Sequence, residues 1–236
     1  MEETGGTGLN RQNARDLLAR GSSYDAVIHC AFTPAKGLTS ADLPAYYADN
    51  LKLTEELLRI PCGKFIYLSS IDVYPVDKTL HAEDEIIPLG LPGSPYPFTK
   101  LLAEALVKSS SASHLILRPG LMLGKYMRAN NLYRLLHEDP AELTLSADSA
   151  FYLVRHEDVL EFIQCALRHD LTGIFNVVPS TSLTLGAIQE KYHRNARFGE
   201  HYYYSRAVAN DKIRRICPLF GKTSEKVLAE FLKAAA

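Results

Sequence analysis

A tyrosine stands four residues before a lysine in the chain, as Tyr96 and Lys100. On a helix, positions i and i+4 lie on the same face, so the ammonium of Lys100 would favour the phenolate form of Tyr96. A phenol activated in this way can exchange a proton with a substrate hydroxyl or carbonyl near neutral pH. The chain has 13 tyrosines, so this spacing also arises by chance, and an ordinary aromatic beside a solvated lysine is the alternative interpretation.

An apolar run that ends in two serines precedes this pair. Residues 63–70 predict a short buried strand that closes with Ser69 and Ser70. Open parallel sheets place their chemistry at the carboxyl ends of their strands. Ser70 precedes Tyr96 by 26 positions, which is enough chain for the serine hydroxyl and the phenol to reach the same substrate oxygen. We therefore expect Ser70, Tyr96 and Lys100 to form a catalytic triad.

This triad and the segments around it resemble the extended short-chain dehydrogenase/reductase family, in its NAD-dependent epimerase/dehydratase branch that acts on nucleotide sugars. The likeness covers roughly residues 25–233 in the family's order. It implies an α/β fold with a Rossmann-like parallel sheet, helices on both faces, an incomplete N-terminal part and a small C-terminal substrate lobe. The matching segments are residues 25–31, 46–58, 63–75, 94–100, 115–124, 151–160, 173–188 and 209–227.

The resemblance also implies roles for single residues. The implied cofactor contacts are Ala31, Asn50, Lys100 and Pro119. The implied substrate contacts are Ser70, Tyr96, Asn130 and Arg214. Asn50 matches a helix asparagine that supports the active site in the family, and a helix-surface role is its alternative. For Arg214 the alternative is a solvated helix face.

The first residues of the chain depart from the family pattern. Thr4–Gly8 resembles the glycine-rich turn that binds the pyrophosphate, yet no strand precedes it and Arg11 stands where a third glycine is expected. Only 17 positions separate Gly8 from Asp25, too few for a complete first half. We therefore favour a helix over residues 8–20 and expect the glycine-rich strand-helix-strand to be missing. If the turn is real instead, the phosphate contacts are Gly5, Gly6 and Gly8.

The family mechanism, if it applies, assigns a function. Tyr96 is then the general acid/base while bound NAD or NADP takes or gives a hydride, and Ser70 holds the reacting oxygen. The sequence thus predicts an epimerase, dehydratase or reductase of a nucleotide sugar and leaves the sugar and the nucleotide open. The alternative is a catalytically inactive remnant or binding module that lacks the cofactor half. The family also implies a homodimer through the helices that carry Asn50 and Tyr96.

Two parts of the chain are expected to form one compact unit. Residues 1–124, with 151–178 returning, are predicted to form the truncated Rossmann-like domain that carries the triad. Residues 125–150 and 179–236 are predicted to form the substrate lobe. On the Tyr96 helix, the predicted buried face carries Leu101, Leu102, Ala105 and Leu106.

Composition excludes several classes of function. The 26 basic and 27 acidic residues give a net charge of −1, which offers no electrostatic basis for binding nucleic acid or an anionic membrane. No apolar run approaches twenty residues and no signal peptide is visible, so we expect a cytoplasmic protein. The histidines lack ligand spacing and Gly-x-Ser-x-Gly is absent, so we expect neither a metal site nor a serine hydrolase. Four cysteines are predicted to be buried free thiols, namely Cys30, Cys62, Cys165 and Cys217.

Overall fold

The computed structural model describes residues 8, 21–34, 37–88, 94–110 and 112–235 of the chain. Gly5, Gly6, Arg11 and the helix predicted after Gly8 lie outside the described residues. The chain divides into two compact units. Unit 1 comprises Met1–Leu68 and Gly93–Ile116, and unit 2 comprises Ser69–Pro92 and Leu117–Ala236. The predicted division into a Rossmann-like domain and a substrate lobe at residue 124 stays a prediction.

Two parallel strands lie at the centre of unit 1. β1 (Tyr24–His29) pairs with β2 (Cys62–Leu68), with Val27 opposite Phe65 and His29 opposite Tyr67. The side chains of β2 from Phe65 onward are buried, as expected of a strand with both faces covered. The strands predicted at residues 25–31 and 63–70 are therefore confirmed to within two residues.

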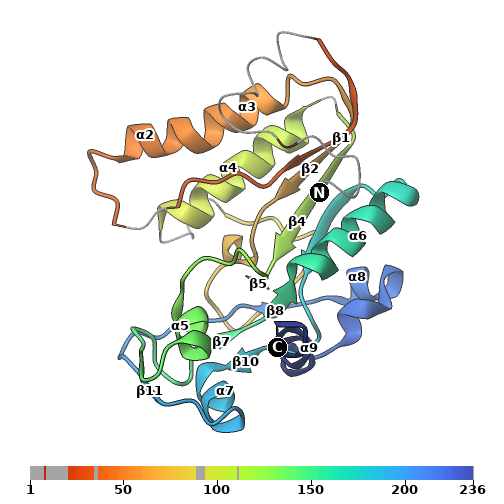
Figure 1. The fold of residues 1–236 in the computed structure, drawn as a ribbon. Helices are drawn as coiled ribbons and strands as arrows, with labels where there is room; N and C mark the ends of the chain where they lie inside the picture. Colours follow the sequence, from red (N-terminus) through yellow and green to blue (C-terminus); the bar gives the residue numbers. More distant parts are fainter. Residues whose placement is uncertain (1–7, 9–20, 35–36, 89–93, 111, 236) are drawn as a thin grey trace. The chain divides into compact units, whose positions relative to one another are not determined.

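Helices cover these strands within unit 1. The segment predicted as one helix over residues 46–58 consists of α2 (Leu43–Tyr47), a π-helical turn η2 (Ala48–Lys52) and α3 (Leu53–Leu57). α4 (Pro95–Ser109) packs against α3 and β2 (Figure 1). It begins with a proline, whose missing N–H costs nothing in the first turn.

The buried face of α4 differs from the predicted one. Leu101 is buried, but Leu102 and Leu106 are half-buried and Ala105 is exposed. Polar residues take part in the buried face of α4 together with apolar ones. The buried side chains of α4 are Pro97, Thr99, Lys100, Leu101, Ala103, Glu104 and Val107.

The main sheet has the strand order β1-β2-β4-β9, with β4 at His114–Pro119 and β9 at Gly173–Val177. The division between the units falls inside β4, so its first half belongs to unit 1 and its second half to unit 2. Non-consecutive neighbours mean that the chain crosses over between strands, as in parallel α/β sheets. The predicted Rossmann-like α/β fold is confirmed.

Short elements build the rest of unit 2. β5 (Leu121–Leu123) pairs in parallel with β8 (Leu153–Arg155), β3 (Leu80–His81) with β12 (Ala207–Val208), and β6 (Ala141–Glu142) with β11 (Ala196–Arg197). β7 (Ala150–Phe151) and β10 (Leu183–Thr184) are antiparallel. The other elements of unit 2 besides β4 and β9 are a 3₁₀ turn η3 (Ile71–Val73), α5 (Asn131–His137), α6 (His156–Arg168), α7 (Leu185–Lys191), α8 (Asp211–Ile216), η4 (Pro218–Gly221) and α9 (Ser224–Ala235).

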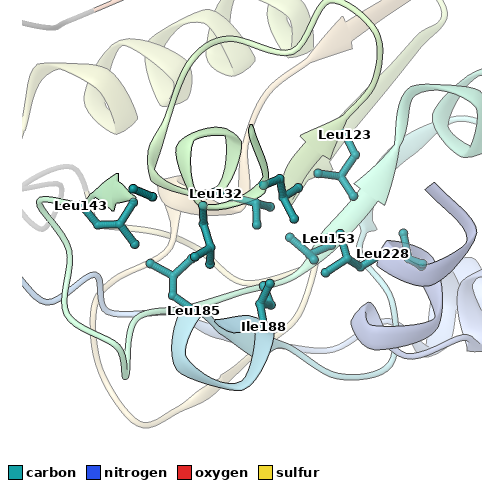
Figure 2. Packing of buried hydrophobic residues seen from close by; sticks show 11 residues of the cluster. Leu123, Leu132, Leu143, Leu153, Leu185, Ile188 and Leu228 are labelled. Carbon is teal, nitrogen blue, oxygen red and sulfur yellow. The ribbon is translucent and has the colours of Figure 1, made fainter. Parts of the chain in front are cut away.

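A leucine-rich cluster forms a core within unit 2 (Figure 2). It joins β5, α5, β8, α7 and α9 through side chains that are almost fully buried. Each buried leucine or isoleucine contributes about 1.5–3 kcal/mol of hydrophobic stabilisation. The labelled members are Leu123, Leu132, Leu143, Leu153, Leu185, Ile188 and Leu228.

The prediction of four buried thiols is wrong for Cys30. Cys30 directly follows the carboxyl end of β1 and is exposed, Cys62 and Cys165 are half-buried, and Cys217 is buried. Within the described ranges no helix has the length and apolar character needed to cross a membrane. Nor do the described residues include a group of three or more His, Cys, Asp or Glu side chains that could hold a metal ion.

Candidate active site

Tyr96 and Lys100 lie on α4, as the spacing predicts. Lys100 is 4% exposed, and its ammonium donates a hydrogen bond of 2.7 Å to the carbonyl oxygen of Leu68, the last residue of β2. The same nitrogen lies 4.1 Å from the centre of the Phe32 ring and 5.0 Å from that of Tyr67. A buried ammonium needs such partners, because an uncompensated charge is costly in a protein interior. The alternative interpretation of a solvated lysine is therefore wrong.

The phenol of this pair is placed by an aromatic contact. Tyr96 is half-buried, and its ring meets Phe32 edge to face, with 5.2 Å between ring centres and 88° between planes. Phe32 thus contacts both Tyr96 and Lys100. No motif in the sequence marks Phe32 as a site residue. The signal that could have identified it is an aromatic residue in the loop that directly follows a strand's carboxyl end.

Asn50 fixes the loop that carries Phe32. Its side chain is buried; the carboxamide oxygen accepts from the N–H of Thr33 at 2.8 Å, and the amide nitrogen donates to the carbonyls of Thr33 and Tyr46. The Thr33 hydroxyl also donates to Asp49 at 3.1 Å. The alternative of a surface asparagine is wrong. A π-helical turn at this position fits the tendency of such turns to occur at functional sites.

His29 lies at the end of β1 as a neutral imidazole. Its Nε2 is 3.0 Å from the Thr54 hydroxyl, and its ring centre lies 5.3 Å from that of Tyr67. Burial, and next the charge of Lys100, lower the pKa of His29 to about 4. His29 is therefore unsuited to carry a proton near neutral pH. Ala31, a predicted cofactor contact, follows two residues later and is exposed.

Ser70 belongs to unit 2, whereas Tyr96 and Lys100 belong to unit 1. Their convergence on one substrate oxygen stays a prediction. Ser70 is buried and caps η3, where its Oγ accepts from the N–H of Asp72 at 3.1 Å. Because Oγ is the acceptor in that bond, the hydroxyl proton can be donated to a substrate oxygen.

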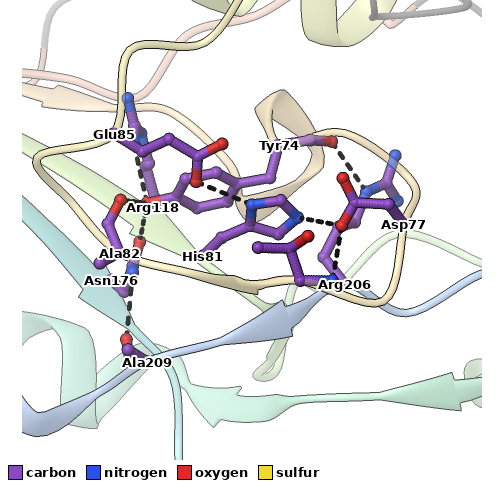
Figure 3. A network of polar contacts seen from close by, with 10 residues as sticks. Tyr74, Asp77, His81, Ala82, Glu85, Arg118, Asn176, Arg206 and Ala209 are labelled. Carbon is purple, nitrogen blue, oxygen red and sulfur yellow. Dashed lines mark hydrogen bonds and ion pairs between the residues drawn. The ribbon is translucent and has the colours of Figure 1, made fainter.

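A polar network surrounds the residues after Ser70 (Figure 3). The buried hydroxyl of Tyr74 accepts from Arg118 at 2.8 Å and lies 2.9 Å from the carboxamide oxygen of Asn176. Burial is the largest cause that raises the pKa of Tyr74. The ring of His81 stacks on Tyr74 at 5.0 Å, with Asp77 and Glu85 at its two nitrogens. This network fixes the loop after Ser70 within unit 2.

The other predicted contact residues have structural surroundings of their own. Pro119 is the buried last residue of β4. Asn130 caps α5 by accepting from the N–H of Tyr133 at 2.9 Å, and Arg214 is exposed and pairs with Asp211 at 2.6 Å. Gly8 is exposed and has open space where a side chain would begin. Their roles toward cofactor or substrate stay predictions.

A parallel α/β sheet with a Tyr-x-x-x-Lys pair anchored at the end of a strand defines a protein of the short-chain dehydrogenase/reductase type. The chain belongs to the NAD dependent epimerase/dehydratase family, whose model matches residues 4–178. The family assignment made from the sequence is thereby confirmed. No curated protein matches the sequence.

Solved structures share this fold. The crystal structure of UDP-glucuronic acid 4-epimerase from Bacillus cereus, in complex with UDP-glucuronic acid and NAD, is 21% identical with a TM-score of 0.72, over 94% of this chain and 77% of that one. A short-chain dehydrogenase/reductase superfamily protein from Agrobacterium tumefaciens with bound NAD is 19% identical with a TM-score of 0.70, over 96% and 83%. A UDP-galactose 4-epimerase is 17% identical with a TM-score of 0.64, over 87% and 78%.

Proposed function

We propose that this chain is an NAD(P)-dependent enzyme that epimerises, dehydrates or reduces a nucleotide sugar, with Tyr96 as its general acid/base. One observation carries the proposal. Lys100 is buried at the carboxyl end of β2, on the Leu68 carbonyl, one helical turn after Tyr96. An ammonium held at the edge where parallel sheets bind ligands, one helical turn after a tyrosine, is suitably placed to activate the phenol.

The residues of unit 1 fit the nicotinamide half of a dinucleotide. An exposed small residue, Ala31, follows the carboxyl end of β1, and the Lys100 ammonium is held at the carboxyl end of the neighbouring strand. These groups would hold the nicotinamide ribose, together with Asn50 through the loop that it fixes. When bound, NAD supplies a reversible hydride acceptor. Gly5 and Gly6, the candidates for the pyrophosphate, lie outside the described residues.

Each step of the proposed reaction besides hydride transfer is assigned to a residue of this chain. Tyr96 removes the proton of a sugar hydroxyl as its carbon is oxidised, and returns a proton as the carbonyl is reduced. The ammonium of Lys100 stabilises the phenolate form that this requires. Ser70 donates its hydroxyl proton to the same oxygen. Asn130 and Arg214 are proposed to contact the nucleotide sugar within the proposed substrate lobe, residues 125–150 and 179–236.

Nucleotide sugars are the proposed substrate class because similar folds come from enzymes of UDP-sugars. UDP-glucuronic acid and NAD are bound in the Bacillus cereus epimerase, and two other similar structures are epimerases of UDP-galactose and UDP-N-acetylglucosamine. The test is incubation of the purified chain with NAD and each of these UDP-sugars, with products followed by NMR.

Tyr96→Phe should lower kcat by at least about 100-fold, because the phenol proton is lost while the ring contact with Phe32 remains. Titration calorimetry with NAD and NADP, using Lys100→Ala as the control, measures the cofactor site separately. Binding of a UDP-sugar without turnover would favour the inactive binding module. Equal turnover by Tyr96→Phe would contradict the assigned chemistry.

We also propose a homodimer through α2, α3 and α4. On α4, half-buried Leu102 and Leu106 and exposed Ala105 offer an apolar surface for such a contact. Light scattering at micromolar concentration tests this, and a monomer would contradict it.

A further inference from the structure

A short turn runs from Ser70 to Tyr74, and the segment 203–206 makes hydrogen bonds to it. The guanidinium of Arg206 donates from Nη1 to the Asp72 carboxylate at 2.6 Å, from Nη2 to the Asp72 carbonyl at 3.4 Å, and from Nε to the Tyr74 carbonyl at 3.3 Å. All of these residues belong to unit 2, and Figure 3 shows Arg206 beside the turn. One side chain thus fixes both the carboxylate and the backbone of the turn.

Burial makes these contacts strong. The side chain of Arg206 is 11% exposed and that of Asp72 is 25% exposed, so water screens their ion pair only partly. Charge-assisted hydrogen bonds of this length are about twice as strong as neutral ones. The turn is therefore held in one conformation more firmly than an exposed ion pair would hold it.

Tyr203 adds a second anchor to Asp72. Its hydroxyl donates to the same carboxylate oxygen at 2.6 Å, and its ring stacks on Phe151 at 4.7 Å. Its N–H donates to the hydroxyl of Ser149, which is fully buried. Burial, and next the charge of Asp72, raise the pKa of Tyr203, so the phenol stays protonated and keeps donating. Tyr203 is therefore itself held by its packing within unit 2.

Asp72, which Arg206 and Tyr203 hold in place, contacts Ser70. The N–H of Asp72 donates to Oγ of Ser70, so the position of Asp72 sets the direction of the Ser70 hydroxyl. We propose that Arg206 is a positioning residue, which acts through Asp72 to aim the Ser70 hydroxyl at the reacting oxygen. The inference rests on the proposed function, since it assigns Ser70 a catalytic hydrogen bond.

Hydrogen exchange of the full chain tests the anchor without any need for activity. The variants are Arg206→Met, Arg206→Lys and Tyr203→Phe, and mass spectrometry follows the peptide that spans Ser69–Pro75. Arg206→Met should speed exchange in this peptide by about 10-fold, and Arg206→Lys by less, because local opening becomes easier when its contacts are lost. The matched control is Lys222→Met, which removes a half-buried ion pair of unit 2, Lys222 to Glu230 at 2.7 Å, that does not contact the turn.

A double-mutant cycle tests the route to the reaction. Arg206→Met should lower kcat by about 10-fold to 100-fold and leave KM within about threefold, since misplacement of a catalytic group costs rate more than binding. In a Ser70→Ala background the same change should alter kcat by less than about threefold, because the group that Arg206 aims is already gone. Arg206→Lys should recover part of the lost rate, and Lys222→Met should keep all of it.

Different failures are distinguishable. Unchanged exchange in Arg206→Met would overturn the anchor, and equal losses with and without Ser70 would overturn the route through the serine. A raised KM at constant kcat would make Arg206 a substrate contact instead. No turnover by the unmutated chain with any of the three UDP-sugars would overturn the proposed function and the catalytic part of this inference together, and the exchange result would still decide the anchor.

Discussion

Phe32 contacts both members of the Tyr96–Lys100 pair. Its ring lies 4.1 Å from the Lys100 ammonium and meets Tyr96 edge to face. A cation over an aromatic face is stabilised by about 0.5–2 kcal/mol. Phe32→Leu removes the π-face but keeps an apolar side chain, so we expect kcat to fall by about 2-fold to 30-fold, the range that this energy gives. Steady-state rates with a UDP-sugar and NAD measure the change.

Two further variants set the scale for Phe32. Phe32→Tyr keeps the ring and should retain most of the rate. Phe198→Leu makes the same exchange at a half-buried position beside the unit 2 core and should change kcat little. A full rate in Phe32→Leu would mean that the ring only fills space.

At this scale the sequence revealed the pair but not its surroundings. The i, i+4 spacing of Tyr96 and Lys100 depends on one helix, and local pattern is enough to read it. Phe32 and Tyr67 reach Lys100 from β1's following loop and from β2. Contacts between segments so far apart in the sequence follow from the packing of strand on helix, which no local pattern encodes.

Among the elements, the π-helical turn at Asn50 is the feature with the clearest energetic consequence. Asn50→Ala leaves the N–H of Thr33 and the carbonyl of Tyr46 without their side-chain partner. An unsatisfied buried group costs about 1–3 kcal/mol, so the free energy of unfolding should fall by that amount. Urea unfolding followed by circular dichroism measures it.

A matched asparagine controls for loss of the amide itself. Asn131 also bonds Thr144 and Leu145, but at the water-accessible surface of unit 2. Water can replace its bonds, so Asn131→Ala should cost less than Asn50→Ala. Equal losses would show that burial of Asn50 has no special weight, and Asn50→Asp tests whether the oxygen acceptor alone suffices.

The sequence predicted where helices and strands lie more accurately than it predicted which side of a helix is buried. The strands β1, β2 and β9 and the helix α4 lie where apolar runs and prolines place them. The face of α4 does not, since Lys100 and Glu104 are buried and Ala105 is exposed. Hydrophobic periodicity assumes that polar side chains face water, and this assumption fails where a helix buries polar side chains, as α4 does.

For the whole molecule, the order of the segments along the chain was the feature that indicated the family from the sequence. Each segment is permissive alone, yet the order of the segments along the chain resembles one family. The family model agrees over residues 4–178, which include the elements from β1 to β9. The polar contacts inside unit 2, such as that of Arg206 with Asp72, could not be predicted from the sequence. They join residues 134 positions apart, and neither partner carries a local signal.

The stability of the whole molecule should depend on pH through one buried histidine, His29. The pKa of His29 falls to about 4 in the fold, from 6.5 in an exposed chain. Between these pH values the unfolded chain binds a proton that the folded chain rejects, so stability is fully present above about pH 6.5 and is lost as the pH falls toward 4. For a shift of this size, the loss between pH 7.5 and pH 5 is about 2 kcal/mol.

Substitution isolates this contribution from that of the carboxylates. Urea unfolding of the unmutated chain and of His29→Gln at pH 7.5, 6 and 5 gives two curves of unfolding free energy against pH. The glutamine cannot titrate, so its curve should be flatter by about 2 kcal/mol over this interval, although Gln lowers stability at pH 7.5. Parallel curves for His29→Gln and the unmutated chain would mean that the imidazole accepts its proton in the fold, and that Lys100 and burial do not hold His29 neutral beside the proposed catalytic pair.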